Sequence, residues 1–146
     1  LVVLLAALVA LVFVVQGALH VPVQGSVLLF MALAALHLFA TTSMGIFLAT
    51  VARSMPQFGM LLVLTLLPLQ MLSGGVTPRE SMPEFVQQVM LAAPTTHFVT
   101  AAQAILYRGA DLSIVWPQFA AIAVIGAAFF AGALIRFRTA VSQMQS

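Results

Sequence analysis

The amino-acid sequence predicts an all-α membrane protein that forms a polytopic helical bundle. Of its 146 residues, 63% are hydrophobic and only 5% are charged, whereas a soluble domain carries about 25% charged residues. Backbone N–H and C=O groups in hydrocarbon must be hydrogen-bonded internally, so the long apolar runs are expected to be helices. Turn and capping residues interrupt these runs at residues 16–25, 53–57 and 73–84, which divides the chain into about four spans.

The composition also excludes several classes of function. The chain has no cysteine, which rules out disulfides and thiolate metal sites. All five basic residues are arginine and they form no stripe with aromatic residues, so nucleic-acid binding is not expected. Without lysine the phosphate-binding Gly-x-x-x-x-Gly-Lys loop cannot form, and the His-Glu-x-x-His and Gly-x-Ser-x-Gly motifs are absent from the sequence. We therefore expect no catalytic residue, no metal site and no ATP site of this type in the chain.

Four spans follow one another along the chain, at residues 1–15, 26–50, 57–73 and 113–135. The first is apolar but shorter than the roughly 20 residues that a crossing helix needs, so we expect it to be truncated. Ser54, followed by Pro56, is typical of a helix N-terminus, because serine caps free N–H groups and proline is tolerated in the first turn. The last span carries small residues that favour close helix contact: Ala120, Ala123, Gly126, Ala127, Ala131 and Gly132.

Residues 76–110 are predicted to form two short amphipathic extracytoplasmic helices, at the membrane surface or dipping into it. Thr77 and Ser81 are each followed three residues later by glutamate, the pattern of a capping box. Residues 81–85 nearly repeat residues 54–58, which shared capping chemistry explains better than an internal duplication. Pro94 is expected to end the first helix and Gly109 to end the second in a left-handed turn. The second helix carries a polar stripe made of Thr96, Thr100, Gln103 and Tyr107.

The arginines predict the orientation of the chain. Arg53, Arg136 and Arg138 fall at one end of the spans without acidic neighbours, so the positive-inside rule places them and the C-terminus in the cytoplasm. Arg79 and Arg108 fall at the other end, together with all three acidic residues of the chain. The amphipathic segment is therefore expected on the extracytoplasmic side.

Four residues within the spans are candidates for a substrate path or gate. His37 is near the middle of its span, with Thr41 on the same face. An ionisable residue at that depth is a functional candidate, and the alternative is a neutral imidazole bonded to a neighbouring helix. Pro68 leaves the carbonyl of Leu64 without its helical donor, which makes it either a hinge or a static kink. Gln70 lines a passage or bonds to the freed backbone groups.

The extracytoplasmic segment contains five further candidates, which could guard the exit: Arg79, Glu80, Glu84, His97 and Arg108. Ion pairs between exposed side chains contribute only about 0–1 kcal/mol. The simpler interpretation is therefore that the charged members of this set orient and cap helices. A gate at the exit is the alternative.

Several motifs occur in a fixed order along nearly the whole chain. Residues 67–83 read Leu-Pro-Leu-Gln-Met-Leu-Ser-Gly-Gly-Val-Thr-Pro-Arg-Glu-Ser-Met-Pro, residues 93–98 read Ala-Pro-Thr-Thr-His-Phe, and residues 107–109 read Tyr-Arg-Gly. Upstream, residues 21–26 (Val-Pro-Val-Gln-Gly-Ser) and 45–53 complete the set. Each motif is weak alone, but the ordered set resembles the ABC type-2 permeases, in particular the drug-exporter-like branch of the bacterial inner membrane.

This resemblance implies a permease subunit that moves a substrate outward across the bacterial inner membrane or between the leaflets of that membrane. It implies two protein partners: a cytoplasmic ABC ATPase subunit, which binds and hydrolyses the ATP, and a second permease subunit in a homo- or heterodimer. Membrane lipid surrounds such a subunit, which itself binds no cofactor. The resemblance also implies that further helices, an extracytoplasmic domain and the ATPase-coupling helix precede residue 1.

Two other functions are compatible with the sequence. A secondary transporter driven by protons would use His37, and its transport would persist without an ATPase but collapse with the proton gradient. A scaffold or membrane anchor would need none of the polar residues within the spans.

Overall fold

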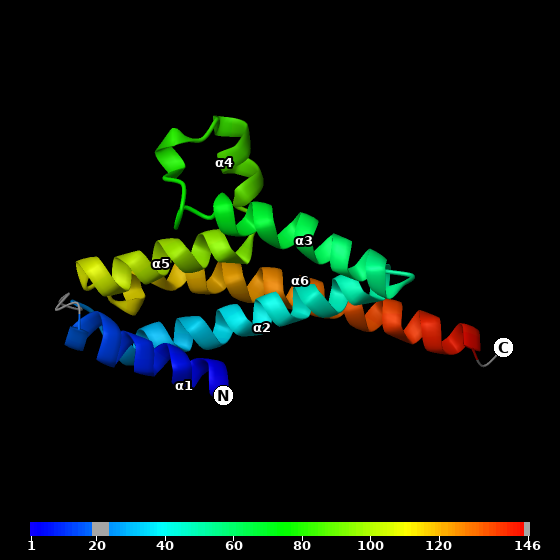
Figure 1. Ribbon diagram of the computed structural model, residues 1–146, viewed down its shortest axis with the longest axis horizontal. Coiled ribbons are helices and arrows are strands. Elements are labelled where there is room, and N and C mark those ends of the chain that lie inside the picture. The colour runs from blue at the N-terminus through cyan, green and yellow to red at the C-terminus, as the bar shows by residue number, and fades with distance from the viewer. Residues whose placement is uncertain (19–23, 145–146) are drawn as a thin grey trace.

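The computed structural model describes residues 1–18 and 24–144, and within these ranges it contains helices and connecting segments but no strand. The prediction of an all-α fold is therefore confirmed. Figure 1 shows an elongated molecule whose longer helices run side by side. The elements in order are α1 (Val2–Val9), the π-helical η1 (Ala10–Ala18), α2 (Val27–Val51), α3 (Met55–Met71), the 3-10 turn η2 (Arg79–Ser81), α4 (Glu84–Met90), α5 (Pro94–Arg108) and α6 (Leu112–Met144).

Two helices of the described residues, α2 and α6, are long and apolar enough to cross a membrane. The apolar helices α1 and α3 are shorter. The 17 residues of α3 extend over about 26 Å at 1.5 Å per residue, against about 30 Å of hydrocarbon. Taken together, α4 and α5 are apolar enough for a further crossing, but they are bent by 93° at the break between them. The four spans expected from the sequence thus correspond to two full-length helices and two shorter ones.

Glycine brings α2 and α6 into close contact. A Cβ atom on Gly126 of α6 would lie 3.1 Å from both Cα and Cβ of Ala40 on α2. A Cβ atom on Gly132 would lie 3.1 Å from the ring of Phe47. Several of the other small residues singled out in the last span are exposed: Ala120, Ala127 and Ala131. The glycines rather than these alanines therefore set the distance between the two helices.

The third member of the core is α5, which packs against both α2 and α6. Ile105 is fully buried in this core, and a Cβ on Gly25 would collide with its backbone. The N–H of Gln24 donates to the carbonyl oxygen of Leu106 at 3.0 Å. Gly109 ends the helix with φ of 63°, as predicted. α5 lies along the two long helices (Figure 1).

Serine caps the N-termini of α2 and α3. The hydroxyl oxygen of Ser26 accepts from the N–H of Leu29 at 3.3 Å. That of Ser54 accepts from the N–H of Gln57 at 3.3 Å, which confirms the cap predicted there. The side-chain oxygen Oε1 of Gln57 in turn accepts from the N–H of Arg53 at 2.8 Å. Reciprocal bonds of this kind fix the start of a helix.

The capping predictions for the segment after α3 are wrong. The hydroxyl of Ser81 donates to the carbonyl oxygen of Pro78 at 2.7 Å, and α4 follows Pro83 without a side-chain cap. Thr77 caps no helix either, because Pro78 occupies the position before η2. Pro94, expected to end a helix, is the first residue of α5. Proline is tolerated at that position because the N–H it lacks would have had no helical partner.

Replacing Gly126 by alanine tests the contact between α2 and α6. The added methyl group has to displace the backbone at Ala40, and overpacking costs about 1–3 kcal/mol. We expect Gly126→Ala to lower the melting temperature of the full-length protein in detergent. Gly45→Ala is the matched control, because nothing lies within 4 Å of a Cβ at Gly45 and alanine favours a helix interior. Equal melting temperatures for the two variants would contradict the close contact.

Candidate functional site

The imidazole of His37 on α2 stacks on the ring of Phe98 on α5, with ring centroids 4.4 Å apart and planes inclined by 18°. The Nδ1 atom of His37 is buried without a hydrogen-bond partner among the described residues. Thr41 donates its hydroxyl hydrogen to the carbonyl oxygen of His37 at 2.9 Å, so it is bonded to its own helix. The stack joins α2 to α5.

Two further polar atoms are buried without a partner in the part of the chain that the structure describes. They are the hydroxyl oxygen of Thr96 on α5 and Oε1 of Gln118 on α6. An unmatched buried polar group costs about 1–3 kcal/mol, so such groups usually meet water, a ligand or another chain. The three core helices thus each contribute one such atom. Neither residue was predicted from the sequence as a site candidate; the available signal was that Gln118 is a lone amide in an apolar run.

Pro68 and Gln70 lie outside this buried core. Helix α3 continues through Pro68, and the N–H of Leu72 donates to the carbonyl oxygen of Pro68 at 2.9 Å. Both candidates are exposed in the described chain, and the carbonyl oxygen of Gln70 accepts from the hydroxyl of Ser73 at 3.0 Å. Their roles as hinge and passage lining stay predictions.

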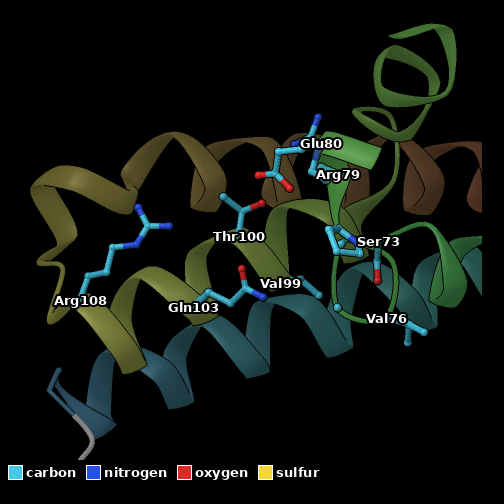
Figure 2. Close-up of a pocket in the computed structure, with 11 residues that line it drawn as sticks. Ser73, Val76, Arg79, Glu80, Val99, Thr100, Gln103 and Arg108 are labelled. Atoms are coloured by element: carbon cyan, nitrogen blue, oxygen red, sulfur yellow. The ribbon is translucent and has the colours of Figure 1, made fainter. Parts of the chain in front are cut away.

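A cavity of about 370 Å³ lies between the segment that follows α3 and the polar face of α5 (Figure 2). We call it the outer cavity. It brings together three of the five extracytoplasmic candidates, together with Thr100 and Gln103 of the polar stripe. Its lining consists of Ser73, Gly74, Gly75, Val76, Pro78, Arg79, Glu80, Val99, Thr100, Gln103 and Arg108.

Arg79 reaches the outer cavity across Gly74. Gly74 has φ of 94°, in the region that favours glycine, and a Cβ there would lie 3.2 Å from Cγ of Arg79. Within the described residues, neither Arg79 nor Arg108 forms an ion pair with a carboxylate at 4.0 Å or less. The outer cavity therefore holds two guanidinium groups against the single carboxylate of Glu80, all of them unpaired within the described chain.

The other two extracytoplasmic candidates lie outside this cavity. Glu84 is the exposed first residue of α4. The Nε2 atom of His97 is 2.8 Å from the carbonyl oxygen of Leu91, and because a carbonyl only accepts, Nε2 is the donor. His97 thus ties the first turn of α5 to the end of α4 and holds the bend between them.

The three arginines predicted for the cytoplasmic face are exposed: Arg53, Arg136 and Arg138. The connection from α2 to α3 and the C-terminal part of α6 carry them, at the end of the bundle away from the turn between α5 and α6 (Figure 1). In residues 1–18 and 24–144, no group of three or more His, Asp or Glu residues could hold a metal ion.

Comparison with known proteins places the chain among transporters. The model of the ABC-2 type transporter family matches residues 1–107. The chain is 62% identical over 144 residues to the inner membrane transport permease YhhJ of Escherichia coli (strain K12), which covers 99% of this chain and 38% of that protein. It is 27% identical over 122 residues, 84% of this chain and 33% of the relative, to the probable multidrug ABC transporter permease YbhR of the same organism.

A third relative is the probable multidrug ABC transporter permease YbhS of Escherichia coli (strain K12), 33% identical over 94 residues. That match covers 62% of this chain and 24% of the relative. The chain thus spans well under half the length of the curated relatives that it matches. No solved structure matches it.

Replacing His37 tests its stack on Phe98. His37→Ala removes one ring of the pair, whereas His37→Phe keeps an aromatic ring between α2 and α5. Aromatic pairs contribute about 0.5–1.5 kcal/mol beyond the area that they bury. We therefore expect thermal unfolding of the full-length protein in detergent to show a lower melting temperature for His37→Ala and little change for His37→Phe. An equal decrease in melting temperature in both variants would mean that the ring nitrogens of His37, rather than the aromatic stack, stabilise the contact between α2 and α5.

Proposed function

The chain belongs to the ABC-2 type transporter family, and from that premise we propose that it is the permease part of an ATP-driven exporter of the bacterial inner membrane. The proposal is carried by the match of almost the entire chain to a transport permease. It is supported by the two long apolar helices and by the unmatched polar atoms buried in their shared core. Polar groups at such depth are costly and mark transport paths more often than scaffolds.

Two partners complete the proposed transporter. We assign ATP binding and hydrolysis to a separate cytoplasmic ABC ATPase, an assignment supported by membership of the ABC-2 type transporter family. A second permease subunit, of the same or a related chain, would cover apolar side chains that the described residues leave open. On α3 these include Val63, Leu64 and Leu67. ABC-2 permeases generally pair with both kinds of partner.

The proposed orientation follows from the distribution of charge. Exposed Arg53, Arg136 and Arg138 carry no acidic neighbours, so the positive-inside rule assigns their end of the bundle to the cytoplasm. The outer cavity and the turn between α5 and α6 then face the extracytoplasmic side.

Movement of α5 against α2 is the proposed gating step. The two helices meet through the stack of His37 on Phe98, and α4 makes only sparse contact with the core. A shift of α5 together with α4 would open the buried atoms of His37 and Thr96 to the path of a substrate. The extracytoplasmic candidates lie on or beside this moving segment, where they would control the exit.

Proton-coupled transport is a second candidate, favoured by one observation. The Nδ1 atom of His37 is buried without a partner among the described residues, and an imidazole can carry a proton. In that case transport would need the proton gradient rather than ATP.

Efflux of a lipophilic cationic dye from proteoliposomes tests the proposal. The vesicles contain the full-length permease with its ATPase, and ATP is supplied on the cytoplasmic side. We expect efflux to be lost when the phosphate-binding lysine of the ATPase is replaced, and to persist when a protonophore removes the proton gradient. The reverse pattern would contradict the exporter and favour the proton-coupled alternative.

His37→Phe tests the proposed path in the same assay. It keeps the aromatic stack but removes the ring nitrogens, so we expect efflux to fall about tenfold, equivalent to about 1.4 kcal/mol in the barrier. Thr50→Val is the control, because the hydroxyl of Thr50 is bonded to the carbonyl oxygen of Phe47 in its own helix, at 2.6 Å. Unchanged efflux in His37→Phe would remove His37 from the path.

A further inference from the structure

We propose that the outer cavity binds the phosphodiester headgroup of a membrane phospholipid. The inference rests on the proposed membrane orientation, which puts this cavity at the extracytoplasmic surface. It does not depend on the export of any substrate.

The charges in the outer cavity match a phosphodiester. Arg79 and Arg108 contribute two guanidinium groups and Glu80 one carboxylate. Figure 2 shows the two arginines on either side of Thr100. Guanidinium groups bind phosphate oxygens through paired, charge-assisted hydrogen bonds. The one surplus positive charge suits the single negative charge of a phosphodiester better than the charge of about −1.5 to −2 on a phosphomonoester.

Backbone N–H groups add further donors to the lining. Residues 73–77 follow α3 as bends, and within the described ranges their N–H groups donate no hydrogen bond to another backbone group. Gly74 and Gly75 carry no side chain, so a phosphate oxygen can approach the backbone there. Successive unpaired N–H groups in a bent segment form a concavity that binds anions.

The surroundings of the outer cavity favour a lipid over a free phosphate. Val76, one of the lining residues, is 70% exposed. Leu67 and Met71, on the last turns of α3, are 58% and 53% exposed. Acyl chains can lie against these apolar side chains while the headgroup meets the charged lining. A free phosphate would gain nothing from them.

Binding of dihexanoyl phosphatidylglycerol to the purified full-length permease in detergent tests the proposal, with the dissociation constant as readout. We expect Arg79→Gln and Arg108→Gln each to weaken binding about tenfold, because each removes one guanidinium partner of the phosphate, worth about 1.4 kcal/mol. Gly74→Ala should weaken binding as well. It keeps both arginines, but the added methyl group would lie 3.2 Å from Cγ of Arg79 and displace that side chain. Arg136→Gln, at the other end of the bundle, is the matched control and should bind like the wild type.

Two comparison probes identify the group that is recognised. Dihexanoylglycerol, which lacks the phosphate, and inorganic phosphate, which lacks the acyl chains, should both bind more weakly than the lipid. Equal binding of either probe would overturn the assignment, as would an unchanged dissociation constant in the folded Arg108→Gln and Gly74→Ala variants. If lipid binding depends on the arginines but the protein shows no ATP-driven efflux, the proposed function is contradicted and the lipid site is not.

Discussion

Close approach of helix backbones at glycine is the contact on which the rest of this structure depends. In lipid, helices are not driven together by water, so their association relies on tight packing and small residues. Gly126 lies against Ala40 of α2, and Gly25 lies against the backbone of Ile105 in α5. These contacts assemble α2, α5 and α6 into one core. Because α5 is held in that core, Phe98 meets His37 inside it, and the opposite, polar face of α5 forms a wall of the outer cavity.

The remaining elements are attached more loosely than α5. α3 makes fewer contacts with the core than α5 does, and α4 makes fewer still. Segments with few buried contacts open at lower cost than core helices. The outer cavity lies between the tightly packed core and a segment with fewer contacts, with one wall on α5 and the other on residues 73–80. A ligand in this cavity would therefore bridge α5 and the loosely packed segment of residues 73–80.

Much of the fold could be predicted from local chemistry. The near absence of charge predicted the membrane helices, and Ser54 predicted the start of α3 because its cap depends only on neighbouring residues. The same reasoning failed at Ser81, where the hydroxyl bonds back to Pro78 instead of forward into α4. The amphipathic pattern of α5 showed which face is apolar but not that α2 and α6 cover it. Nor could the sequence show that Arg79 and Arg108 share one cavity, because that requires the fold of residues 73–80 over α5.

In the proposed topology the packed helices cross a membrane, with the outer cavity on one side and the arginine-rich end of α6 on the other. Single-cysteine labelling with a membrane-impermeant maleimide tests this topology in the full-length protein, once any cysteine outside residues 1–146 has been replaced; these residues themselves contain none. Glu80 and Arg136 are both exposed, so a cysteine at either position can react. We predict that Glu80→Cys reacts from the extracytoplasmic side of intact cells and Arg136→Cys only after the membrane is made permeable. Labelling of both positions from the same side would contradict the account.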